Sequence, residues 1–280
     1  MKTKTKRMLK SIYNVIQKPE MRILPGQLSF FFLLSLIPLI ALIGAIASSF
    51  HLSLSTFENL FAISIPAEVS DALVGFVSGK SIGTSMGIFY VSAFILASNG
   101  THSMIIASNS IYKFKDKDYL SRRIKALLMT IILVFLLLFL IVVPVFGDFI
   151  LKLINNAMGT TTSAKAIQVI YQVLKYPISL IFIFVSIKML YTMAPDKKIK
   201  SSTTTKGAIF TTIIWILASE VYSVYIGVFN KYDLFYGSVA NILILMLWIY
   251  LLSYVFVLGM ALNANTYEKE KSLLDKLTNN

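Results

Sequence analysis

The chain has 280 residues, of which 56% are hydrophobic and only 14% are charged, and its formal net charge is +13. Soluble domains carry roughly a quarter charged residues, so this composition excludes an ordinary soluble fold. The absence of cysteine excludes disulfides, zinc–thiolate sites, iron–sulfur clusters and a thiol nucleophile. The charges fall in short runs between apolar stretches, a pattern typical of a protein that crosses a lipid bilayer.

Six apolar segments are each long enough to cross a bilayer, which takes about 20 apolar residues. The predicted fold class is therefore all-α, a polytopic membrane protein built as a bundle of six transmembrane helices. A basic segment 1–26 precedes the six-helix domain 27–264, and a tail 265–280 follows it. The first apolar run is too long for a cleavable signal peptide. The expected spans are 27–50, 82–110, 124–146, 176–194, 206–229 and 237–264.

Positive charge alternates between successive loops. Twenty of the 26 Lys and Arg residues lie in the N-terminal head, segments 113–125 and 195–206, and the tail, whereas the intervening loops hold five. Because positively charged loops stay in the cytoplasm, the sequence predicts a multi-pass membrane protein with both termini in the cytoplasm.

The two long outer loops, 51–81 and 147–175, contain apolar residues at helical spacing. They are predicted to form amphipathic helices on the outer membrane surface, and ordinary packed loop helices are the alternative. The tail is predicted to be a short surface helix.

The strong positive charge could indicate nucleic acid as a partner. The basic residues flank the apolar spans, however, where they attract anionic lipid. The expected partners are therefore the lipid bilayer and anionic phospholipid headgroups at the cytoplasmic basic loops, with no nucleic acid.

Polar residues within a span are costly, so they face the bundle interior and are candidates for function. The second span carries a polar stripe at helical spacing. This stripe indicates either hydrogen bonding between helices or a substrate pathway. Its members are Ser85, Ser92, Asn99, His102, Ser103, Asn109 and Ser110.

Two charged residues lie inside spans. Glu220 is in the fifth span, and Lys188 in the fourth is close enough to its end to extend to the cytoplasmic surface. We predict an intramembrane polar centre of Asn99, His102, Lys188 and Glu220, in which His102 or Lys188 neutralises Glu220. A protonated or hydrogen-bonded structural Glu220 is the alternative.

Four other residues are predicted to shape helix packing. Pro38 should kink the first span. Asn241, Gly259 and Asn263 share a line along the sixth span, and the glycine allows another helix to approach closely.

Several motifs, in this order and spacing, resemble the YihY/BrkB family of bacterial inner-membrane proteins, formerly called ribonuclease BN. The resemblance covers roughly residues 20–267 and implies a six-helix cytoplasmic-membrane protein with envelope or transport roles. Met260 departs from the glutamate that the family carries in its sixth span. The similar segments are LSFFFLLSLIPLIAL at 28–42, YTMAP at 191–195, Gly207-Ala208 with Trp215, Tyr236-Gly237-Ser238, LWIY at 247–250, Leu258-Gly259 and Leu262-Asn263-Ala264.

The residues do not support an enzyme. The chain has two histidines, His51 and His102, at no metal-ligand spacing, and neither a phosphate-binding loop nor a Gly-x-Ser-x-Gly elbow. Asp116 and Asp118 form the only close pair of acids in the cytoplasmic segments before the tail, and we interpret this pair as a solvated charge run. No metal, cofactor or ribonuclease activity is predicted.

Two classes of function remain open. The first is a transporter or flippase-like protein for a lipid or envelope component, without its own ATPase. The second is a non-transporting membrane scaffold or accessory protein of the cell envelope. A membrane-embedded enzyme acting on lipid is a third, weaker reading.

Overall fold

The computed structural model describes residues 13, 15–49, 86–136, 162–229 and 238–278, and within them the regular elements are helices without any strand. The predicted all-α class is therefore confirmed for this part of the chain. The helices are α2 (Glu20–Ser49), α5 (Met86–Tyr112), a helix at 119–136 without a label, α7 (Thr162–Met193), α8 (Thr205–Phe229) and α10 (Ser238–Thr278).

Three helices are longer than the predicted spans. α2 begins at Glu20, within the segment assigned to the basic head, and α7 begins at Thr162, within an expected outer loop. α10 continues to Thr278, so the tail is not a separate surface helix but the end of the sixth helix. The rest of the two outer segments, 51–81 and 147–161, lies outside the described residues.

Prolines lie inside two of these helices without ending them. Pro25 and Pro38 are in α2 and Pro177 is in α7. A proline removes one helical hydrogen bond, and neighbouring helices in a bundle compensate for that loss. α2 is helical on both sides of Pro38, and the kink expected there stays a prediction.

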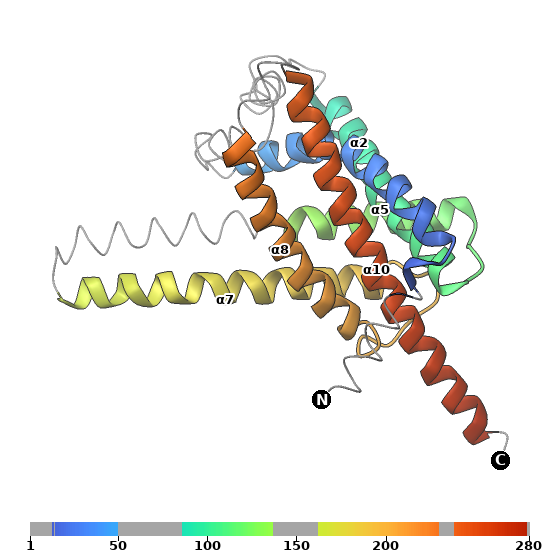
Figure 1. Ribbon diagram of the computed structural model, residues 1–280. Coiled ribbons are helices and arrows are strands. Elements are labelled where there is room, and N and C mark those ends of the chain that lie inside the picture. Colours follow the sequence, from blue (N-terminus) through green and yellow to red (C-terminus); the bar gives the residue numbers. More distant parts are fainter. Residues whose placement is uncertain (1–12, 14, 50–85, 137–161, 230–237, 279–280) are drawn as a thin grey trace.

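Helices α2, α5 and α10 lie side by side, and α8 packs against α10 and α7 (Figure 1). The first part of α7 extends away from the other helices (Figure 1). The second part of α7 packs against α8 and so joins the bundle.

The largest buried side chains gather around Phe256 of α10, which is fully buried. Its ring centroid lies 4.6 Å from that of Tyr191, 6.0 Å from that of Trp215 and 6.5 Å from that of Phe32. The Tyr191 hydroxyl donates a hydrogen bond of 2.7 Å to the Phe256 carbonyl. Four helices are thus joined at one aromatic cluster.

The crossing of α8 and α10 depends on two glycines. A Cβ atom on Gly259 would collide with the Thr211 hydroxyl, and one on Gly207 would collide with the Gly259 carbonyl. Asn263 accepts a hydrogen bond of 2.7 Å from the backbone N–H of Gly207. The predicted packing residues Gly259 and Asn263 therefore lie where the two backbones come closest, whereas the side chain of Asn241 lies outside the described part.

Large hydrophobic side chains face outward on the described helices. Ile88 of α5 is 77% exposed, Val221 of α8 is 68% exposed and Leu247 of α10 is 67% exposed. By length and composition, one helical segment among the described residues, Leu243–Leu277, is able to cross a membrane, and Pro177–Met193 is a shorter apolar segment. Most of the predicted spans continue beyond the described ranges, so a six-span bundle stays a prediction.

Candidate functional site

A cavity of about 590 Å³ lies between the helices, and every described helix contributes to its wall. Most of the lining is apolar. The polar side chains among it belong to Ser35, Thr101, Ser186, Ser219 and Glu220, with the indole of Trp215 and of Trp248. We call this space the central cavity.

Among the described residues, Glu220 is the only carboxylate that lines the central cavity, and its side chain is exposed. It lies fifteen residues after the start of α8 at Thr205, about 22 Å along the helix at 1.5 Å per residue. No ion pair joins the described residues Glu220, His102 and Lys188 to one another. The predicted neutralisation of Glu220 by either base therefore stays a prediction.

The other predicted members of the polar centre have different partners. Asn99 accepts a hydrogen bond of 2.9 Å from the Arg123 guanidinium, which also donates to the Ile95 carbonyl at 2.8 Å. The His102 ring contacts Tyr119 edge to face, and its buried Nε2 atom has no hydrogen-bond partner in the described part of the chain. Asn99 and His102 therefore interact with the helix at 119–136.

Lys188 is half-buried, with its ammonium group 5.9 Å from the centre of the Phe184 ring one turn earlier. A cation over an aromatic face is stabilised by the quadrupole of the ring. Within the described residues, this contact with its own helix takes the place of an acidic partner.

The buried polar face of α5 differs in part from the predicted stripe. Ser92 and Ser110 are exposed, so these two residues were wrongly assigned to the interior. Ser98, Thr101 and Ser108 are buried instead. The predicted stripe was wider than the buried face of α5, because helical spacing alone does not show where that face ends.

Thr101 connects α5 to the helix at 119–136. Its hydroxyl donates to the Ala126 carbonyl at 2.8 Å and lies 2.8 Å from the Thr130 hydroxyl. Both threonines are fully buried, so these bonds satisfy polar groups that would otherwise be costly in an apolar interior.

A hydrogen-bond network joins three chain segments at the end of the bundle that carries the basic loops. Asn109 of α5 is buried, with 1% of its surface exposed. Its amide donates to Asp116 at 2.8 Å and to Asp196 at 2.7 Å, and its carbonyl oxygen accepts from the backbone N–H of Asp196 at 2.9 Å. All the hydrogen-bonding groups of this side chain except one lone pair are used.

Lys125 completes the network from the helix at 119–136. Its ammonium group donates to the carboxylate of Asp196 at 3.1 Å and to the carbonyls of Ala194 and Pro195 at 2.8 and 2.7 Å. Lys125 thereby binds the two carbonyls that directly follow the end of α7, where a positive charge is favoured by the helix dipole.

Hydrogen bonds hold Asp196 in its charged form. Its side chain is 3% exposed, and this burial opposes ionisation. The hydrogen bonds from Asn109, Lys125 and the Lys117 backbone outweigh burial and lower the pKa of Asp196 below its usual value.

The pair Asp116 and Asp118 is only partly a solvated charge run. Asp118 is exposed, and its carboxylate accepts hydrogen bonds from the backbone N–H and the hydroxyl of Ser121. Asp118 thereby caps the start of the following helix. Asp116 instead forms an ion pair of 3.0 Å with Arg122 and binds Asn109. Asp116 is exposed, as the prediction requires, and it is in addition bound to Asn109, which it approaches only after the chain reverses.

The chain reverses at Lys113, where φ is 55°. The backbone N–H of Phe114 donates to the Asn109 carbonyl at 2.9 Å and that of Lys113 to the Ser110 carbonyl at 3.2 Å. This pair of bonds is the Schellman arrangement that ends a helix. It turns residues 114–118 back toward Asn109 and so permits the network.

No group of three or more metal-ligating side chains occurs among the described residues. The central cavity and the network offer hydrogen-bonding and ion-pairing groups. Asp196 and Lys125 were missed by sequence reasoning, since their partners lie 69 or more positions away in the chain.

A helical protein with outward-facing apolar side chains, a cavity between its helices and a basic polar end belongs to the class of integral membrane proteins. The chain belongs to the virulence factor BrkB family, whose model matches residues 12–279. The predicted family is thereby confirmed.

Relatives agree with this class. The chain is 29% identical over 269 residues to the ribonuclease-like protein YfkH of Bacillus subtilis, covering 94% of this chain and 96% of that protein. It is 28% identical over 255 residues to a UPF0761 membrane protein of Pseudoalteromonas translucida, covering 85% and 79% of the two chains. It is 27% identical over 278 residues to a UPF0761 membrane protein of Vibrio vulnificus, covering 91% and 82%. No solved structure matches the chain.

Proposed function

We propose that this membrane protein crosses the bacterial cytoplasmic membrane six times with both termini in the cytoplasm. We further propose that it moves a lipid or another envelope component across the membrane without hydrolysing a nucleotide. The observation that carries the proposal is the central cavity, whose wall is built by every described helix.

The chemistry of the cavity suits an amphipathic substrate. Its mainly apolar wall would accept acyl chains, while the Glu220 carboxylate and nearby hydroxyls such as Ser219 would bind polar groups. Glu220 lies about 22 Å along α8, a depth that is still within a hydrocarbon layer roughly 30 Å thick. A carboxylate at that depth is costly and is favoured where it serves a pathway.

The lipid-movement proposal is tested by reconstituting the full chain into liposomes that contain a fluorescent phospholipid. Movement of the lipid between leaflets is followed by chemical quenching of the outer leaflet. We expect protein-dependent movement, a several-fold loss of rate with Ser219→Trp, which fills the cavity, and a loss with Glu220→Gln. Val221→Trp is the matched control, because Val221 faces outward on the same helix.

Three results would contradict transport through the cavity. These are no protein-dependent movement of any tested lipid, equal rates in the Ser219→Trp and Val221→Trp variants, or an unchanged rate with Glu220→Gln at normal expression. The first result would favour the scaffold or accessory protein.

The proposed topology is tested separately with single cysteines, which the cysteine-free chain allows. A cysteine at Lys198 should react with a membrane-impermeant maleimide only after the cells are opened, and a cysteine at Lys165 should react in intact cells. Labelling of both positions in intact cells would contradict the topology.

A further inference from the structure

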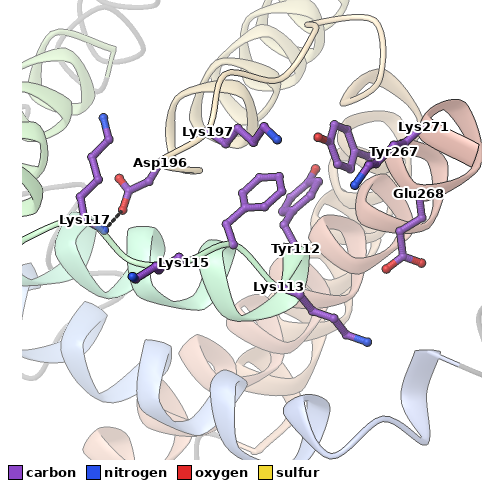
Figure 2. A pocket seen from close by; sticks show the side chains of 10 residues that line it. Tyr112, Lys113, Lys115, Lys117, Asp196, Lys197, Tyr267, Glu268 and Lys271 are labelled. Carbon is purple, nitrogen blue, oxygen red and sulfur yellow. Dashed lines mark hydrogen bonds between the residues drawn. The ribbon is translucent and has the colours of Figure 1, made fainter. Parts of the chain in front are cut away.

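A second cavity of about 600 Å³ lies at the end of the molecule that carries the basic loops. We call it the polar-end pocket (Figure 2). It is formed where the end of α5, the segment after α7 and the last part of α10 meet. Its lining residues are Tyr112, Lys113, Phe114, Lys115, Lys117, Asp196, Lys197, Tyr267, Glu268 and Lys271.

Three aromatic rings form one side of the pocket. The rings of Tyr112 and Phe114 are stacked at 5.3 Å, and the edge of Tyr267 contacts both at 5.9 and 5.5 Å. Such stacked and edge-to-face pairs stabilise one another beyond their burial. This aromatic cluster therefore gives the pocket a packed wall, contributed by the end of α5, the residues just after it and α10.

The charge of the pocket is strongly positive. Five lysines and two acids line it, and one of the acids, Asp196, is already neutralised by Lys125 at 3.1 Å. The ammonium group of Lys197 lies 5.8 Å from the centre of the Phe114 ring. No described acid forms an ion pair with Lys197 or Lys271, so both charges are available to an anion.

Two of the five lysines point to the same place. The ammonium groups of Lys197 and Lys271 lie on the side of the aromatic cluster where the hydroxyls of Tyr112 and Tyr267 also lie (Figure 2). Lys113 and Lys115 extend away from this cluster (Figure 2). The donors drawn on this side of the aromatic cluster are thus two ammonium groups and two phenols (Figure 2).

The Tyr112 hydroxyl is an unsatisfied donor at this place. Tyr112 is 5% exposed, and its buried hydroxyl has no hydrogen-bond partner within the described residues. Burial, together with the neighbouring Tyr267, raises the pKa of Tyr112, so the hydroxyl keeps its proton at neutral pH. A buried polar group without a partner is destabilising, and an acceptor in the pocket would remove that cost.

We propose that the polar-end pocket binds a phosphate group, through the ammonium groups of Lys197 and Lys271 and the hydroxyl of Tyr112. The phosphate belongs to an anionic phospholipid headgroup or to a free phosphate; both present the same tetrahedral anion. Hydrogen bonds from charged donors to phosphate are among the stronger kinds in proteins. The inference rests on the pocket alone and does not depend on lipid movement through the central cavity.

Binding is measured by thermophoresis on the detergent-purified full chain with two probes, dioctanoyl phosphatidic acid and sodium phosphate. The double variant Lys197→Gln with Lys271→Gln should weaken binding tenfold or more. The matched control is Lys198→Gln with Lys269→Gln, which removes the same charge from exposed neighbours outside the pocket. This control should change affinity less than threefold.

Tyr112→Phe is a second, charge-neutral variant and should weaken binding at least threefold with the melting temperature unchanged or raised. If sodium phosphate binds with the same dependence on the variants, the ligand is the free anion; if only the lipid does, it is a headgroup. The proposal is overturned if neither probe binds the wild-type chain. It is also overturned if the two double variants weaken binding equally, since the attraction would then be a diffuse surface effect. A Tyr112→Phe variant that binds like wild type would overturn it as well.

Discussion

Asn109→Ala is the substitution that most directly tests how the polar end is held together. The Asn109 side chain makes two hydrogen bonds to carboxylates and one to a backbone N–H, and these bonds join α5, the turn after it and the segment after α7. Alanine removes all three bonds and retains the helical propensity of the position.

The magnitude follows from the three bonds. A hydrogen bond to a charged group contributes about 1.5–3 kcal/mol and a neutral one about 1 kcal/mol. Together the two charged bonds and the neutral one set an upper bound of roughly 4–7 kcal/mol on the loss of unfolding free energy. Asp196 keeps Lys125 and the Lys117 backbone as donors, and the Asp116 side chain is 47% exposed and regains water. We therefore expect the free energy of unfolding to fall by about 2–4 kcal/mol, since burial leaves part of the desolvation cost uncompensated.

The free energy of unfolding is measured by reversible denaturation of the purified protein in detergent micelles. Ser110→Ala is the matched control, because Ser110 is the next residue of the same helix and is exposed. Its effect should stay within about 0.5 kcal/mol. The reasoning is refuted if Asn109→Ala costs no more than Ser110→Ala, which would mean that the network contributes no net stability.

Three further predictions concern packing, a buried hydroxyl and pH. Gly259→Ala should lower the free energy of unfolding by about 1–3 kcal/mol, because the added Cβ meets Thr211. Gly26→Ala is the matched control: the added Cβ meets open space, so this variant should be neutral or raise the free energy of unfolding by up to about 1 kcal/mol. Equal melting temperatures of the two variants would contradict this prediction. Tyr191→Phe should cost about 1–2 kcal/mol by removing two buried hydrogen bonds, and an unchanged stability in the same denaturation would contradict it. The folded state holds the pKa of Asp196 below its unfolded value of about 3.9, so its contribution is present above that pH and is lost as pH falls below it. The Asp196→Asn variant should therefore lose less stability than wild type between about pH 5 and about pH 3, and parallel curves would refute the assignment.

Much of the fold follows from local patterns in the chain. Long apolar runs predict helices because only a helix satisfies its own backbone in an apolar environment, and the all-α class and the family were both correct. Gly259 and Asn263 stand out for the same local reason, since a small residue four positions from a polar one marks a helix contact. The predicted lengths of α7 and α10 were too short. The apolar pattern ends at the expected boundary of the lipid, whereas both helices continue beyond that boundary.

The candidate sites were less accessible to sequence reasoning. Asn99 and His102 were recognised as polar residues in an apolar helix, yet their partners Arg123 and Tyr119 belong to the next helix. Asp116 was interpreted as solvated because nothing in its neighbourhood along the chain shows that it meets Asn109. The two cavities are assembled from up to six helices and have no local signature at all.

The sequence by itself determined that this chain is helical, apolar enough for a membrane and basic at alternate loops, because these properties are sums over neighbouring residues. Only the tertiary structure decided that Asn109, Lys125 and Asp196 form one network, that Lys197, Lys271 and Tyr112 line one pocket, and that Glu220 borders a cavity. Each of these results depends on how helices cross. A shift of one crossing by a single helical turn, about 5.4 Å, would exchange the partners without changing the pattern of any helix.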